Sequence, residues 1–318
     1  MALKRLNMPV FGLLMSLKVW YWYYMSKKAT RYLSGAEGGG SGCRVVLADA
    51  SGKTLGQGVA GPANATTDLA QAIENLRAAV KAAARDAGVK RSALGDSVAH
   101  VGLAGVLNAR VAGRIAAELA VRQARVTDDR VTSVAGALGQ RNGVLAAIGT
   151  GSTLAAQRGD TVQCIGGWGL NLGDQASGAW LGRALLEHVL LVHDGLAEAT
   201  ALSDTVLKEF NGDPGAIVTF AARARPSDYA GHAPRIVATA LGGDSAARGL
   251  MQRGADYLVR ALKVLEFSDG DVLCLGGGLG PHYAGFLPED IRARIVKPEG
   301  TALDGALALA RAALERGA

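Results

Sequence analysis

Short apolar runs alternate with longer amphipathic stretches over most of the chain. In the first half, residues 44–49 and about 54–58 are predicted strands joined by a turn, and residues 98–103 form a further apolar run. A long alanine-rich helix is predicted between them, because Asp68 and Gln71 have the spacing of a capping box and the periodic stretch continues to about Ala87. Another helix leads to a strand that ends at residues 127–129. This alternation is typical of the α/β class.

The second half repeats the plan. Residues 144–148 are an apolar run that ends in a glycine turn at residues 149–152, and residues 153–157 return as a strand. Several helices are expected between about residues 176 and 267, the first over residues 176–191, and the strand at 272–275 follows them. In the first half, the run at 32–36 meets a glycine turn at 37–42 in the same way. The pattern predicts two related domains that face a cleft, although the halves are too dissimilar to prove a duplication.

Glycine makes up 44 of the 318 residues, about twice its usual share, with no repeat to explain it. The glycines are therefore expected to be local backbone devices. Consecutive glycines permit positive φ and let backbone N–H groups approach an anion. Each glycine turn alone is typical of a tight hairpin, but two in equivalent places could hold a polyphosphate from opposite walls. Neither is a P-loop: the one candidate, at residues 52–54, has Leu47 where the first glycine is required.

The net charge of +6 arises in residues 1–31, which carry six basic side chains and no acidic one, while the rest carries 28 of each sign. This distribution argues against a nucleic-acid binder. The apolar run at residues 8–25 is interrupted by Lys18 and lacks a cleavage site, so a membrane span or signal peptide is not expected. We expect residues 1–31 to be a disordered or artefactual extension. Cys43, Cys164 and Cys274 are far apart, which indicates reduced thiols in a cytoplasmic protein.

Two groups of polar residues are candidates for chemistry. Asp128 and Asp129 end a predicted strand before an apolar helix, where a carboxylate serves either as a helix N-cap or as a general base. Trp168 lies in a Gly-Gly-Trp-Gly segment shortly before Asp174 and Gln175. A carboxylate and an amide suit sugar hydroxyls and an indole suits a sugar ring, whereas the alternative is a core tryptophan and a helix cap. The five scattered histidines are interpreted as structural.

Four motifs, taken in order, resemble the sugar kinase/Hsp70/actin superfamily: Glu-Gly-Gly-Gly-Ser at 37–41, Gly-Thr-Gly-Ser at 149–152, Gly-Asp-Gln-Ala-Ser-Gly at 173–178 and Gly-Gly-Gly at 276–278. Within it, the chain from about Tyr32 to its end is similar to the amino-sugar kinases of the BadF/BadG/BcrA/BcrD ATPase family. The resemblance implies an α/β fold of two ribonuclease-H-like (actin-like ATPase) domains flanking a nucleotide- and sugar-binding cleft. The domains would be residues 32–138, with a C-terminal helix at about 302–318 packing back on them, and residues 139–301.

The resemblance also implies ATP and Mg²⁺ as cofactors and assigns roles by motif. The catalytic base would be Asp129, and Glu37 would bind Mg²⁺ through water. The implied phosphate contacts are Gly39, Gly40 and Ser41 in one loop and Gly149, Thr150 and Gly151 in the other, with Gly276, Gly277 and Gly278 at the adenosine. The implied sugar contacts are Asn64, Trp168, Asp174 and Gln175.

The implied activity is phosphorylation of the 6-hydroxyl of an amino sugar. Gln175 resembles the glucosamine kinases, whereas the Gly-Gly-Trp-Gly segment is similar to the N-acetylglucosamine enzymes, so glucosamine is preferred only narrowly. Glu37 and Ser41 stand where the family commonly has Asp and Thr, which keeps a non-catalytic sugar sensor as an alternative. An ATPase regulator is a further alternative, but the three cysteines do not resemble the iron–sulfur arrangement of those relatives. The expected partners are small molecules and not nucleic acid or membrane, and a homodimer is compatible with the resemblance.

Overall fold

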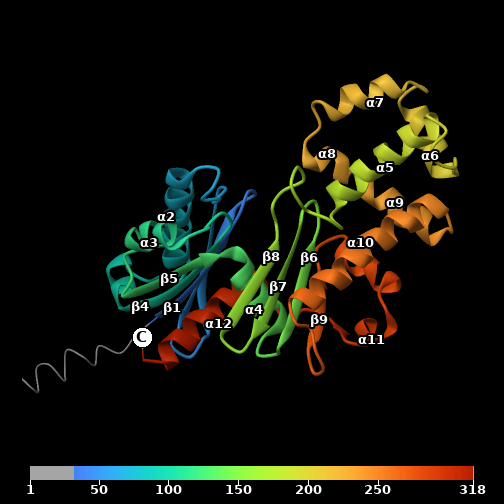
Figure 1. Cartoon of the computed structure of the whole chain (residues 1–318). Helices are drawn as coiled ribbons and strands as arrows, with labels where there is room; N and C mark the ends of the chain where they lie inside the picture. The colour runs from blue at the N-terminus through green and yellow to red at the C-terminus, as the bar shows by residue number, and fades with distance from the viewer. Residues whose placement is uncertain (1–31, 318) are drawn as a thin grey trace, which may run out of the picture.

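The computed structural model describes residues 32–317, so the expected extension at residues 1–31 lies outside the described residues. Two five-stranded sheets lie side by side (Figure 1). The first sheet has the order β3-β2-β1-β4-β5 and consists of β1 (Tyr32–Gly38), β2 (Cys43–Asp49), β3 (Thr54–Ala60), β4 (Ser97–Leu103) and β5 (Gln123–Asp128). The second has the order β10-β9-β6-β7-β8 and consists of β6 (Gly143–Ile148), β7 (Ser152–Arg158), β8 (Thr161–Gly166), β9 (Val272–Gly276) and β10 (Ile295–Val296).

The two sheets share one topology. In each, the first three strands form an antiparallel meander, and the fourth strand pairs in parallel with the first. The fifth strand then pairs in parallel with the fourth. The glycine turns predicted from the sequence join the first two strands of each meander. The relation between the halves, which sequence identity could not prove, is therefore visible in the strand order.

Helices cover the sheets and are far more numerous beside the second (Figure 1). Asp68 caps α2 by accepting a hydrogen bond from the N–H of Gln71 at 3.0 Å, as the sequence predicted. The helices of the first half are α2 (Leu69–Asp86), α3 (Ala109–Ala117) and α4 (Asp129–Leu138). Those of the second half are α5 (Gly178–His193), α6 (Ala201–Glu209), α7 (Pro214–Ala221), α8 (Pro226–Ala230), α9 (Ala233–Leu241), α10 (Ser245–Val264), α11 (Glu289–Arg292) and α12 (Ala302–Glu315), with the 3-10 turn η2 (Gly280–Phe286). The 3-10 turn η1 (Arg91–Asp96) lies in the first half. Within residues 32–317, no helix is long and apolar enough to cross a membrane.

The helix expected from residue 176 begins two residues later. Ala176 has φ of +68°, which lies outside the right-handed helical region. Ser177 is the N-cap, and its hydroxyl accepts a hydrogen bond from the N–H of Trp180 at 3.0 Å. The predicted start of the helix was wrong because hydrophobic periodicity does not reveal a residue with positive φ.

The last helix, α12, follows the second sheet in sequence but packs against β1, β4 and α4 of the first (Figure 1). Glycines permit its close crossing with α4. A Cβ at Gly136 of α4 would lie 1.9 Å from the carbonyl oxygen of Thr301, and a Cβ at Gly305 of α12 would lie 2.1 Å from that of Thr132. Since α4 begins at Asp129, this crossing fixes the helix that carries the predicted catalytic carboxylate.

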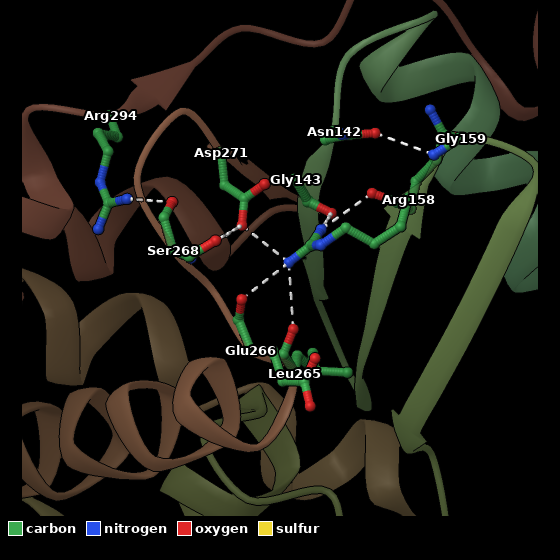
Figure 2. A network of polar contacts seen from close by, with 10 residues as sticks. Asn142, Gly143, Arg158, Gly159, Leu265, Glu266, Ser268, Asp271 and Arg294 are labelled. Atoms are coloured by element: carbon green, nitrogen blue, oxygen red, sulfur yellow. Dashed lines mark hydrogen bonds and ion pairs between the residues drawn. The ribbon is translucent and has the colours of Figure 1, made fainter.

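At the other end of the second sheet, the guanidinium of Arg158 ties β7 to the segment before β9 (Figure 2). It contacts the carboxylate of Asp271 at 2.8 Å and donates to the carbonyls of Leu265 and Glu266 at 3.2 Å each. Asp271 is 5% exposed and also accepts from the N–H of Ser268 at 2.8 Å. Because this carboxylate is buried, loss of its cation would leave an unpaired charge inside the protein, and the arrangement lies away from the glycine turns.

Candidate active site

The parallel strands of the first sheet end together. Gly38 of β1 pairs with Leu103 of β4, and Leu103 pairs with Asp128 of β5. The chain segments that follow these three residues therefore lie along one edge of the sheet. They are the glycine loop at residues 39–42, the loop that begins at Ala104, and the first turn of α4, which begins at Asp129.

The 39–42 loop exposes backbone donors. The N–H of Gly39 donates to the carbonyl of Gly42 at 3.0 Å, but those of Gly40 and Ser41 have no acceptor among the described residues. A Cβ at Gly40 would meet nothing within 4 Å, so packing does not require glycine there. None of the glycines in this loop has positive φ, so the predicted dihedral reason for them was wrong. What the glycine at position 40 provides is an open face on the backbone, suited to an anion.

The second sheet has an equivalent edge. Ile148 pairs with Ser152, and Thr153 pairs with Gly166 at the end of β8. The loop at 149–151 is held against α5, because the N–H of Gly178 donates to the carbonyl of Gly149 at 2.8 Å. The N–H groups of Thr150 and Gly151 find no acceptor in residues 32–317. This loop therefore also presents unsatisfied donors, again without positive φ.

The 276–278 loop packs onto the end of β6. Gly277 has φ of +77°, and a Cβ there would lie 2.3 Å from the carbonyl oxygen of Ile148, so only glycine fits. The N–H of Leu279 donates to the same carbonyl at 3.0 Å. At Gly278, by contrast, a Cβ would meet nothing within 4 Å. The loop thus places Gly278 beside the 149–151 loop with an open backbone face.

Two cavities meet at the 149–151 loop. The larger cavity, about 660 Å³, is lined by Gly149, Thr150 and Gly278 and by α8, α9 and η2 residues. The smaller cavity, about 320 Å³, is lined by Gly151 and Asp174 together with residues 147, 152, 153, 167 and 169. A single loop of free N–H donors therefore separates a large apolar cavity from a small one that contains a carboxylate.

Asp174 is 8% exposed and has φ of +57°. Its carboxylate accepts from the N–H of Gly169 at 3.2 Å, and burial raises its pKa above the ordinary range. The residues that follow are held from two sides. The Ser152 hydroxyl donates to the Gln175 carbonyl at 2.6 Å, and the buried Tyr283 hydroxyl donates to the Ala176 carbonyl at 2.7 Å. This turn is preorganised, and neither support was indicated by the sequence.

Asp128 and Asp129, at the start of α4, differ in their contacts. Asp128 is the N-cap, accepting from the N–H of Arg130 at 3.0 Å, and it also forms an ion pair with the Arg130 side chain at 2.5 Å. Asp129 is half-buried in the first turn. Burial, and next the charge of Asp128, raise the pKa of Asp129 to about 6, and Arg130 partly offsets this. The Asp128 carboxylate is therefore occupied by structural contacts, while the pKa of Asp129 lies close to that of a general base that works at neutral pH.

Arg130 also reaches the second sheet. Its Nη1 donates to the carbonyl of Gly166 at 3.3 Å. Gly166 ends β8 and leads into the segment that lines the smaller cavity. Arg130 was not predicted as a functional residue, and its one local signal in the sequence was its position next to the two carboxylates.

Two predicted sugar contacts, Trp168 and Asn64, lie outside the smaller cavity. Trp168 is 71% exposed, so the alternative of a core tryptophan is excluded. It lines an outer cavity of about 480 Å³ with Arg183 and Tyr229 and not the smaller cavity. Asn64 lies beside the first sheet, where its Oδ1 accepts from the N–H of Thr66 at 2.9 Å. As they stand, these side chains do not share a cavity with Asp174.

The predicted magnesium contact, Glu37, forms an ion pair with Arg44 across the β1–β2 hairpin. The Glu37 side chain is 15% exposed. Among residues 32–317, no group of three or more His, Cys, Asp or Glu side chains could hold a metal ion. A Mg²⁺ that arrives with phosphates needs only one or two protein carboxylates, so Glu37 fits such an ion and does not form a metal site by itself.

The fold and the glycine loops are those of the actin-like ATPase class, and comparison with known proteins agrees. The chain belongs to the BadF/BadG/BcrA/BcrD ATPase family, whose model matches residues 35–306. The resemblance stated from the motifs and the predicted two-domain α/β fold are confirmed.

Three similar proteins illustrate the relation. The chain is 30% identical over 282 residues to the glucosamine kinase GspK of Vibrio cholerae, covering 88% of this chain and 95% of that protein. It is 31% identical to a candidate N-acetylglucosamine kinase from Chromobacterium violaceum of solved structure, with a TM-score of 0.74 and coverage of 88% and 99%. A ROK hexokinase from Thermus thermophilus, at 16% identity, a TM-score of 0.54 and coverage of 90% and 100%, shares the fold.

Proposed function

We propose that this protein transfers the γ-phosphoryl group of ATP to the 6-hydroxyl of an amino sugar, with glucosamine preferred narrowly over N-acetylglucosamine. The observation that carries the proposal is the 149–151 loop, whose free N–H groups lie between the larger and the smaller cavity. Phosphoryl transfer requires mainly positioning and charge stabilisation, and a donor-lined wall between two cavities supplies both.

The chain offers phosphate contacts from both sheets. The N–H groups of Gly40 and Ser41 would bind the phosphates from the first sheet, and those of Thr150 and Gly151 from the second. The larger cavity would take the nucleoside beside Gly278. Binding energy from two walls favours closure around the ligand, which excludes water that would otherwise compete with the sugar.

Asp129 is the proposed general base. Its raised pKa makes it a better proton acceptor than an ordinary aspartate, yet at pH 7 and above it is largely ionised. It would accept the proton of the sugar hydroxyl as that oxygen attacks. Asp128 is unsuited to this role because its carboxylate is occupied by Arg130 and by the helix cap.

The proposed Mg²⁺ would be held by phosphate oxygens, with Glu37 contributing through a water molecule. When bound, the ion supplies charge neutralisation on the phosphates and fixes their geometry. The ion pair with Arg44 holds the Glu37 carboxylate at the end of β1, beside the 39–42 loop.

The sugar would occupy the smaller cavity with Asp174 as an acceptor for its hydroxyl groups. The preference for glucosamine rests on the Asp174-Gln175 pair, which resembles that of the glucosamine kinases. The Vibrio relative supports this preference and the Chromobacterium relative favours the N-acetylated sugar. The roles of Asn64 and Trp168 as sugar contacts remain predictions.

A coupled ADP-release assay tests the proposal. With MgATP, the purified chain is given glucosamine, N-acetylglucosamine, glucose or no sugar, and the phosphorylated position is read by NMR. We expect sugar-dependent ADP release, fastest with glucosamine, and a 6-phosphate product. ADP release at the same rate with and without sugar would instead favour an ATPase regulator. Sugar binding without turnover would favour a sensor.

A further inference from the structure

The larger cavity offers little that could recognise the edge of a nucleotide base. Among the described residues that line it, only Thr150 and His282 have polar side chains. Thr150 belongs to the loop of free N–H donors, which leaves His282 as the one polar side chain on the remaining walls. The rest of the lining is glycine, alanine, proline, valine and leucine, and includes Leu241, which is 76% exposed at its edge.

Part of the backbone of these walls is also engaged in hydrogen bonds within the protein. The Ala238 carbonyl in α9 accepts from the N–H of Gly242 at 3.1 Å. The N–H of Leu279 donates to Ile148 and that of Gly178 donates to Gly149. These three groups are therefore unavailable to a base, whereas the backbone face of Gly278 stays open.

His282 does not distinguish the purines. Adenine presents an amino donor and a ring-nitrogen acceptor at the edge where guanine and hypoxanthine present an oxygen acceptor and a ring N–H donor. A neutral imidazole has one donor and one acceptor nitrogen and can exchange them by changing tautomer. It can thus satisfy either edge.

We propose that the protein selects its phosphoryl donor by the polyphosphate and not by the base, so that GTP and ITP serve as donors besides ATP. This inference rests on the proposed function, because it takes the larger cavity as the nucleoside site. A site that hydrogen-bonds a substrate group rejects an analogue lacking it by roughly 10⁴–10⁵, whereas an apolar pocket discriminates by only about 10–200-fold. The apolar lining places this protein in the second regime.

Binding and turnover are measured separately on the full chain. ADP, GDP and IDP are each used to displace a fluorescent ADP analogue without sugar, and kcat/KM is measured for ATP, GTP and ITP with saturating amino sugar. We expect the three dissociation constants, and the three kcat/KM values, to agree within about 200-fold. A preference for the adenine nucleotide of a thousandfold or more overturns the inference while leaving a sugar kinase intact. Equal displacement without sugar-dependent turnover overturns the proposed function and supports base-independent binding.

A matched pair of variants tests whether the nucleotide base binds in the larger cavity. Ala238→Phe introduces a large side chain into the larger cavity from an exposed position, and Ala70→Phe makes the same change on an exposed face of α2, away from it. Ala238→Phe should weaken ADP, GDP and IDP by one common factor of at least tenfold and leave displacement by inorganic tripolyphosphate unchanged, while Ala70→Phe changes none. Unaltered nucleotide affinity in Ala238→Phe would overturn the inference, because the base would then bind elsewhere.

Discussion

The Arg130 guanidinium lies against the Asp128 carboxylate, with 2.5 Å between Nε and Oδ1. The same guanidinium donates to the carbonyl of Gly166 at 3.3 Å. One side chain thus joins the first turn of α4 to the end of β8, which belong to different sheets. It keeps Asp128 occupied and places a positive charge beside Asp129.

Replacing Arg130 with Gln should therefore change the pH dependence of the reaction. Arg130 lowers the pKa of Asp129, so its loss should raise that pKa further and move the acidic limb of kcat/KM to higher pH. Arg130→Lys retains the charge and should keep the limb near its original position. If Arg130→Gln only lowers kcat, with an unmoved pH profile, the residue has a structural role alone.

In the unaltered protein, kcat/KM should also fall at acidic pH. Because Asp129 acts as a base only when ionised, kcat/KM for the sugar should rise about tenfold per pH unit below pH 6 and become constant above it. An acidic limb near pH 4 would mean that the base is an aspartate of ordinary pKa and would reject the burial argument.

The crossing of α12 with α4 predicts a large effect from a small change. Gly305→Ala would place a methyl group 2.1 Å from the Thr132 carbonyl oxygen, so the helices must separate. We expect the free energy of unfolding to fall by about 2 kcal/mol or more in urea denaturation. Gly113→Ala in α3 is the matched control, because its Cβ would meet nothing within 4 Å, and it should stabilise the protein by about 0.4–1 kcal/mol. Equal effects of the two substitutions would contradict this packing.

Arg158 should matter for stability and not for turnover. Arg158→Met keeps the aliphatic stem but leaves the buried Asp271 without its cation, which should lower the free energy of unfolding by about 2–4 kcal/mol. Arg311→Met breaks an exposed pair with Glu315 on α12 and should cost less than about 0.5 kcal/mol. Sugar-dependent turnover of both folded variants should match the unaltered protein; a selective loss in Arg158→Met would show that the far end of the sheet influences the site.

Local patterns were sufficient to predict much of this fold. The glycine hairpins, the α2 cap at Asp68 and the strand ending at Asp128 each depend on residues close in sequence. They could be recognised because turn and cap preferences are local properties of the backbone.

The remaining features depend on long-range packing. The hydrogen bond from Tyr283 to Ala176 spans 107 residues, and that from Arg130 to Gly166 spans 36. Trp168 was a plausible core residue by type, yet its loop carries it to the surface. The open backbone faces of the two glycine loops also depend on which neighbouring groups are absent, and a sequence does not reveal that.

The central claim is that Asp129 is the general base, and its replacement by Asn tests it most directly. The raised pKa of Asp129 lowers the stability of the folded state progressively between about pH 4 and pH 6, with the full loss present above pH 6, because the folded protein holds that proton more tightly than the unfolded chain does. The free energy of unfolding of Asp129→Asn should therefore exceed that of the unaltered protein by roughly 1–3 kcal/mol at pH 7.5. The difference should vanish below pH 4.

The decisive measurement is sugar-dependent ADP release by Asp129→Asn at pH 7.5, alongside its affinity for ADP. The account predicts that kcat falls by roughly 10²–10⁴ while ADP affinity stays unchanged, and that Asp128→Asn loses far less. A folded Asp129→Asn protein that retains most of its turnover would contradict the account.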